Sequence, residues 1–159
     1  MKPKLRASKP IHVLIVEDEF LISEWVAQSL SELGFAVQTA ANAADALRHL
    51  ASDPVDVLFT DINLPGGMDG VALARRAREL LPDLPVVYAS ARVTMLAPDA
   101  CVPGAIGVPK PYEPAFVGRL LTAALHHAAA GMPAGTVPIV PVRRARETPR
   151  ASGCGNLRR

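Results

Sequence analysis

Short apolar runs rich in β-branched residues alternate along the chain with longer segments whose apolar residues recur every three or four positions. The short runs are typical of buried parallel strands and the longer segments of amphipathic helices. We expect strands at residues 11–16, 35–39, 55–60, 84–88 and 105–108. We expect helices at residues 22–33, 43–50 and 71–81, and a last one from Pro114 onward. Asn42 is placed to cap the second helix.

The segment between the fourth and fifth predicted strands has the weakest pattern. Pro98 and Pro103 exclude one long helix across residues 92–104, although the alternation as a whole predicts about five helices. Residues 65–70 read Pro-Gly-Gly-Met-Asp-Gly and form a loop by composition.

Strands that alternate with helices predict an α/β domain. We expect a five-stranded parallel sheet with helices on both faces, the flavodoxin-like, doubly wound arrangement. In such sheets ligands bind beyond the carboxyl ends of the strands, near a switch in strand order. The functional residues should therefore be those that directly follow the strands.

The residues that follow four of the predicted strands are three acids, an amide, a hydroxyl and a lysine: Glu17, Asp18, Asp61, Asn63, Ser90 and Lys110. Three neighbouring carboxylates repel one another, which implies a compensating cation. Oxygen ligands without Cys or His favour Mg²⁺ or a similar hard ion. With a hydroxyl and a lysine nearby to receive an anion, the set indicates a phosphoryl-transfer site.

Taken singly, each of these residues has a simpler explanation. The acids at 17–19 suit a solvated helix start, and Asp61 with Asn63 suits a turn. Ser90 alone reads as a strand-end hydroxyl, and Lys110 alone as a surface cation. Their joint placement at one predicted sheet edge is what favours a functional site.

Charge divides the chain into three parts. The formal net charge is +2, but residues 1–10 carry +4 and residues 131–159 carry +5, which leaves −7 for residues 11–130. We interpret residues 1–10 as a flexible basic leader and 11–128 as the domain. Residues 129–159 are rich in Pro and Arg without apolar periodicity, which predicts a disordered tail.

Cysteine usage and hydropathy indicate the compartment. The two cysteines lie far apart and match no metal-binding spacing. No apolar stretch approaches the roughly 20 residues that a membrane helix needs, and the N-terminus lacks a signal-peptide pattern. We therefore expect a cytoplasmic protein.

Five blocks, at residues 14–19, 60–65, 68–70, 89–91 and 110–111, occur in a characteristic order and spacing. Together they resemble the receiver domain of bacterial two-component response regulators, here of the stand-alone, single-domain type. The resemblance covers about residues 11–128. It implies phosphorylation-dependent signalling through protein–protein contacts, with a phosphodonor that is a sensor histidine kinase or a histidine phosphotransfer protein.

The resemblance also implies a role for each site residue. Asp61 would be the phospho-acceptor and a ligand of Mg²⁺, which Asp18 would hold directly and Glu17 through water. Asn63 would offer its backbone carbonyl to the metal.

The remaining two residues would act on the phosphoryl group. Ser90 would donate a hydrogen bond to it and Lys110 would pair with its charge, the Lys110-Pro111 peptide bond being cis. Beyond self-phosphorylation and slow self-dephosphorylation, no enzymatic activity is expected.

Three features depart from the usual receiver pattern. The loop at 65–70 is one glycine longer. Gly107 stands where the family often carries a Tyr or Phe that moves when the hydroxyl residue moves, and Tyr88 is either a substitute or a core residue. Residues 92–104 correspond to the helix that usually presents the partner surface, so a different or partly disordered element is expected there.

Several alternatives stay open. The protein could be a degenerate receiver that works as a constitutive binding module. The tail arginines could contact nucleic acid, or the tail could fold back onto the acidic domain. An aspartate-nucleophile phosphatase is disfavoured because Asp-x-Asp does not follow the first strand, and a dinucleotide-binding domain because no Gly-rich turn does.

Overall fold

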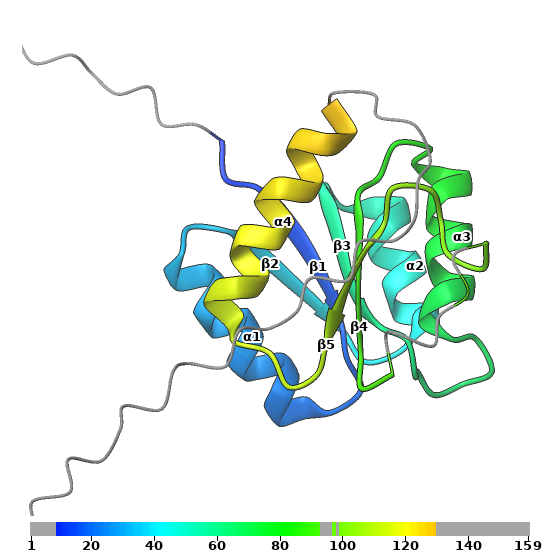
Figure 1. Cartoon of the computed structure of the whole chain (residues 1–159), viewed down its shortest axis with the longest axis horizontal. Helices are drawn as coiled ribbons and strands as arrows, with labels where there is room; N and C mark the ends of the chain where they lie inside the picture. Colours follow the sequence, from blue (N-terminus) through cyan, green and yellow to red (C-terminus); the bar gives the residue numbers. More distant parts are fainter. Residues whose placement is uncertain (1–8, 93–96, 98, 130–159) are drawn as a thin grey trace, which may run out of the picture.

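The computed structural model describes residues 9–92, 97 and 99–129, in which strands and helices alternate (Figure 1). The strands are β1 (His12–Val16), β2 (Ala36–Ala40), β3 (Val57–Asp61), β4 (Val86–Ser90) and β5 (Ile106–Pro109). The helices are α1 (Phe20–Glu32), α2 (Ala43–Ser52), α3 (Gly70–Leu80) and α4 (Pro114–Ala129). No helix in these ranges is long and apolar enough to cross a membrane.

All five strands pair in parallel, in the order β2-β1-β3-β4-β5. The chain passes from β1 outward to β2 and then returns across β1 to β3, so the strand order reverses between β1 and β3. This reversal places a crevice at the carboxyl ends of these two strands. The predicted flavodoxin-like sheet is therefore confirmed.

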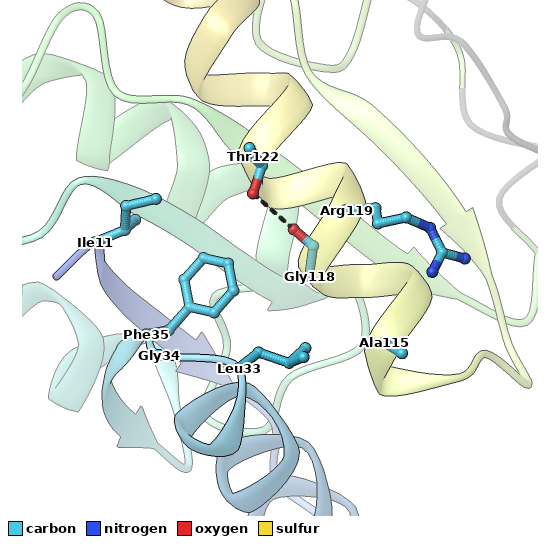
Figure 2. A pocket seen from close by; sticks show the side chains of 8 residues that line it. All are labelled: Ile11, Leu33, Gly34, Phe35, Ala115, Gly118, Arg119 and Thr122. Carbon is cyan, nitrogen blue, oxygen red and sulfur yellow. Dashed lines mark hydrogen bonds between the residues drawn. The ribbon is translucent and has the colours of Figure 1, made fainter. Parts of the chain in front are cut away.

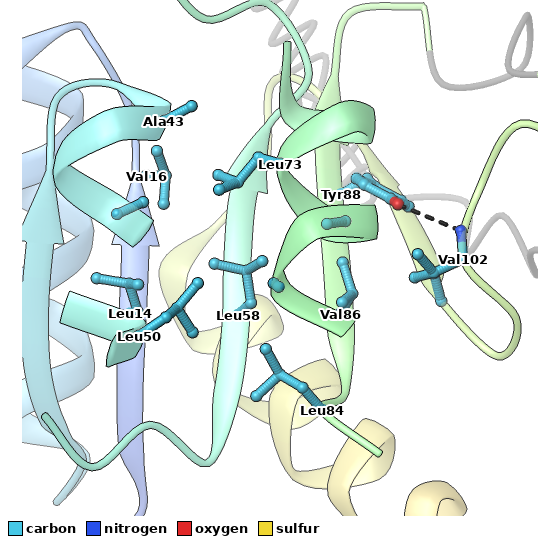
Figure 3. Close-up of a cluster of buried hydrophobic side chains, with 14 of the residues drawn as sticks. Leu14, Val16, Ala43, Leu50, Leu58, Leu73, Leu84, Val86, Tyr88 and Val102 are labelled. Carbon is cyan, nitrogen blue, oxygen red and sulfur yellow. Dashed lines mark hydrogen bonds between the residues drawn. The ribbon is translucent and has the colours of Figure 1, made fainter. Parts of the chain in front are cut away.

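Each face of the sheet carries its own apolar core. Leu14 and Val16 point to the face covered by α2 and α3, and Val13 and Ile15 to the face covered by α1 and α4. Figure 3 shows the first cluster between β1, β3, β4 and the two helices. Because both faces are buried, these strands are apolar at consecutive positions rather than at alternate ones.

Side chains fix where two of the helices begin. The carbonyl oxygen of the Asn42 side chain accepts a hydrogen bond from the backbone N–H of Asp45 at 2.9 Å, which confirms the predicted cap of α2. Asp69 caps α3 in the same way, by accepting from the N–H of Ala72 at 2.7 Å. Both caps satisfy helix N–H groups that have no partner within the helix.

Residues 99–105 of the β4–β5 connection form turns rather than a helix. Two guanidinium groups of α3 hold it: Arg75 donates to the carbonyl oxygen of Ala100 at 2.6 Å, and Arg78 to that of Pro103 at 3.0 Å. Four of the about five predicted helices are therefore seen in the described ranges. Residues 93–96 and 98, with most of the predicted leader and tail, lie outside those ranges.

Tyr88 is a core residue. Its side chain is fully buried in the α3-side cluster, and its hydroxyl oxygen accepts a long hydrogen bond from the N–H of Val102 at 3.4 Å. Burial raises the pKa of its phenol to about 12. Of the two interpretations of Tyr88, packing in the core is the one that the structure supports.

Gly70 lets α3 begin directly against the end of β3. Its N–H donates to the carbonyl oxygen of Ile62 at 2.7 Å, and a Cβ atom at this position would lie 2.0 Å from the carbonyl oxygen of Asp61. That neighbour is backbone and cannot rotate away. Only glycine therefore fits here without moving the end of β3.

We predict that Gly70→Ala lowers the free energy of unfolding by at least about 2 kcal/mol, because the backbone must shift to relieve the contact. Gly118→Ala in α4 is the control, since its Cβ would meet the flexible Leu33 Cδ1 at 3.0 Å. The gain in helix propensity of about 1 kcal/mol should largely offset that contact. Urea unfolding measures both variants, and equal midpoints would contradict the prediction.

Candidate functional site

Acidic side chains from two strand ends meet at the crevice between β1 and β3. Glu17 and Asp18 directly follow β1, and Asp61 is the last residue of β3. Each offers a carboxylate oxygen, and these oxygens all lie within 4.8 Å of one another. Glu17 and Asp61 are buried, whereas Asp18 is exposed, so the group opens to solvent on one side.

Lys110 brings a third strand end to this group. It follows β5, and its ammonium group donates to Glu17 Oε2 and to Asp61 Oδ2, at 2.8 Å in each case. The next peptide bond, Lys110-Pro111, is cis. Lys110 thus joins Glu17, 93 positions before it in the sequence, to Asp61, 49 positions before it.

Burial and the mutual ion pair have opposed effects on the pKa values of Lys110 and Glu17. Burial by itself would lower the pKa of Lys110, but its hydrogen bonds to Asp61 and Glu17 and their negative charges raise it above its ordinary value. Lys110 is therefore fully charged at neutral pH. Burial raises the pKa of Glu17, and the neighbouring Lys110 counteracts only part of that effect.

The donor set fits a hard divalent cation. Three carboxylates against one ammonium leave a formal charge of −2 at the group. All the ligand atoms are oxygens, and the exposed side of the group leaves room for the water ligands that Mg²⁺ usually keeps. The sequence-based expectation of a Mg²⁺ site is consistent with this arrangement.

The two oxygens of the Asp61 carboxylate have different partners. Oδ2 accepts from Lys110, and Oδ1 accepts from the backbone N–H of Asn63 at 3.1 Å. Asn63, two residues past the strand, therefore touches the carboxylate through its amide. Together the two bonds hold the carboxylate in one orientation at the sheet edge.

Ser90 lies at the same edge, at the end of β4. Its register partner is Pro109, and the neighbouring Ala89 pairs with Asp61. Its hydroxyl oxygen accepts from the backbone N–H of Arg92 at 3.1 Å. The hydroxyl proton therefore remains available to another acceptor.

Sequence reasoning missed two buried groups beside the site. Thr60 donates its hydroxyl to the carbonyl oxygen of Asp61 at 2.8 Å. Tyr112 follows the Lys110-Pro111 pair and packs edge-on against Phe59 with ring centroids 5.6 Å apart; burial raises its pKa to about 12. The only sign of them in the sequence was that Thr60 directly precedes Asp61 and that Tyr112 directly follows Lys110-Pro111.

The acidic group opens to solvent through the exposed Asp18. A groove of about 480 Å³ lies elsewhere, between the end of α1 and the first turns of α4, and Leu33, Phe35 and Gly118 are among its lining residues (Figure 2). None of the residues that line this groove belongs to the acidic group. The chemistry of the described residues therefore gathers at the carboxyl edge of the sheet.

Comparisons with known proteins agree on one family. The family model of the response regulator receiver domain matches residues 13–117. The chain is 35% identical over 92 residues to the response regulator receiver protein CpdR of Brucella abortus, covering 57% of this chain and 76% of CpdR. It is 33% identical over 90 residues to the sensor histidine kinase RcsC of Salmonella typhimurium, 57% of this chain but only 9% of RcsC.

Among solved structures, a response regulator receiver protein from Sinorhizobium medicae superposes with a TM-score of 0.70 at 27% identity. That match covers 76% of this chain and 98% of the other. The receiver domain of the hybrid histidine kinase CckA gives a TM-score of 0.61 at 28% identity, covering 72% and 98%.

We predict that Mg²⁺ stabilises the folded chain through this acidic group. A ligand that binds only the folded state at ten times its dissociation constant adds about 1.4 kcal/mol to the free energy of unfolding. Asp18→Asn should remove this gain, whereas Glu24→Gln, which neutralises an exposed acid of α1 outside the group, should keep it. Unfolding with MgCl₂ and with KCl at equal ionic strength measures the effect, and equal gains in both variants would rule the site out.

Proposed function

This chain belongs to the response regulator receiver domain family, and we propose that Asp61 is its phospho-acceptor. The observation that carries the proposal is the placement of the Asp61 carboxylate. One oxygen accepts from Lys110 and the other from the N–H of Asn63, beside Glu17 and Asp18. This is a carboxylate nucleophile held next to fixed positive charge.

The proposed reaction transfers a phosphoryl group from a phosphohistidine. A carboxylate oxygen of Asp61 forms a bond to phosphorus as the phosphorus–nitrogen bond breaks, and the imidazole leaves with the electron pair of that bond. Lys110 neutralises charge on the transferred group. The Ser90 hydroxyl, whose oxygen already accepts from the backbone N–H of Arg92, donates a hydrogen bond to a phosphoryl oxygen.

Mg²⁺ is the cofactor of this proposal. Asp18, Asp61 and the backbone carbonyl of Asn63 would bind it directly, and Glu17 through water. The ion would supply charge neutralisation for the phosphoryl oxygens. The formal charge of −2 at the group supports this part of the proposal.

The proposed donor is a sensor histidine kinase or a histidine phosphotransfer protein, and the proposed setting is the cytoplasm. The phosphorylated chain would act by binding another protein, without enzymatic activity beyond its own phosphorylation and slow dephosphorylation. A second candidate, a constitutive binding module, draws on Gly107, which leaves no aromatic ring at the position where the family often carries one.

We predict that incubation with a small phosphodonor and Mg²⁺ adds about 80 Da to the intact mass of the chain, the mass of one phosphoryl group. Asp61→Asn should abolish the adduct, and Asp83→Asn, an exposed aspartate of the α3–β4 connection, should retain it. A wild-type chain that gains no mass would favour the constitutive binding module.

We further predict that Lys110→Met slows adduct formation about 100-fold or more, the usual cost of removing one charge-stabilising donor. Lys9→Met is the control because Lys9 is an exposed lysine at the start of the described chain. The time course of the mass change gives both rates. If the two variants reacted equally fast, Lys110 would have no part in the transfer.

A further inference from the structure

The first two turns of α1 carry an exposed apolar surface next to the phosphoryl site. The side chains of Phe20, Leu21 and Trp25 are 71%, 74% and 52% exposed. Leu21 and Trp25 are one helical turn apart and therefore lie on the same side of α1, and Phe20 extends this exposed apolar patch at the start of the helix. Burial of such a side chain is worth about 1.5–3 kcal/mol, and apolar patches of this kind usually mark a contact surface.

The charged residues that border this patch along α1 are all acidic. Glu19 precedes Phe20 and Glu24 precedes Trp25, and both acids are exposed. Residues 17–33 contain no Lys or Arg. We call Glu19, Phe20, Leu21, Glu24 and Trp25 the α1 face. Its best complement is an apolar segment flanked by cations.

The chain itself contains such a segment. Residues 137–142 read Val-Pro-Ile-Val-Pro-Val, and Arg143, Arg144 and Arg146 follow directly. Proline-rich apolar segments bind surfaces that present aromatic rings at a low entropic cost. The apolar residues 137–142 could cover the apolar side chains of the α1 face, and the arginines that follow could pair with the acids at its border.

The distance from the last described residue permits this contact. α1 and α4 pack side by side on one face of the sheet, with the first turns of α4 against the end of α1 (Figure 2). A path from Ala129 back along α4, about 24 Å, and then along α1 from Leu33 to Trp25, about 12 Å, is about 36 Å long. The 11 residue steps from Ala129 to Val140 span up to about 36–40 Å when extended, so the later residues of the apolar run can reach the exposed side chains of α1.

We propose that residues 137–146 bind the α1 face, with the apolar run on Phe20, Leu21 and Trp25 and the arginines paired with Glu19 and Glu24. The contact itself does not depend on the proposed phosphorylation. Its regulatory consequence rests on the proposed function: a phosphodonor protein must approach the same edge to reach Asp61. The bound segment would exclude it and lower its apparent affinity in proportion to the covered fraction.

Trp25 reports on this contact directly, because it is the single tryptophan of the chain. The test compares acrylamide quenching of Trp25 fluorescence in the full chain and in the double variant Ile139→Asp/Val140→Asp. A segment that covers the face in half of the molecules would halve the quenching rate, so its release should raise quenching about twofold. The control Ala151→Asp/Leu157→Asp adds the same charge outside the segment and should leave quenching unchanged.

The arginines are tested by a second pair of full-length variants. Replacing Arg143, Arg144 and Arg146 by Ser should raise Trp25 quenching at low salt and remove its salt dependence. The same replacement at Arg150, Arg158 and Arg159 should do neither. Equal effects of both triple variants would show unspecific attraction and overturn the proposal.

Two other outcomes would also overturn it. Unchanged quenching in Ile139→Asp/Val140→Asp would leave the α1 face free for another protein, such as the phosphodonor. Quenching that falls as protein concentration rises would assign the contact to a second copy of the chain. Because fluorescence needs no phosphorylation, failure here remains distinct from failure of the mass measurement on Asp61.

Discussion

The paired hydrogen bonds of Lys110 with Glu17 and Asp61 are the interaction on which this site depends. They join the ends of β1, β3 and β5 through one ammonium group, with both distances at 2.8 Å. Two buried carboxylates side by side would repel each other strongly without that cation. The sheet edge can therefore hold two buried carboxylates and still leave a negative charge that a divalent cation can balance.

The scaffold around this edge limits how the site can move. Gly70 and Thr60 fix the backbone of Asp61, one by close approach and one by a hydrogen bond. On the far side, Arg75 and Arg78 attach the described part of the β4–β5 connection to α3. Residues 99–105 therefore form turns that are tied to α3.

Much of the fold could be predicted from the sequence because a parallel sheet covered on both faces leaves a plain pattern. The continuous apolar run before Glu17 and the one before Asp61 predicted buried strands, and both are present in β1 and β3. Asn42 predicted its helix start from its own chemistry. The candidate site followed from one rule, that polar residues after parallel strands share an edge.

By itself, then, the sequence determined the elements, the class of sheet and the kinds of residue at its edge, because periodicity and local hydrogen bonding are encoded over a few positions. The strand order β2-β1-β3-β4-β5, which makes Glu17 and Asp61 neighbours, was decided by tertiary packing. So were the contact of Lys110 with Glu17 across 93 residues and the burial of Tyr88. A local pattern shows which face of an element is buried, but only the packed chain fixes what lies against it.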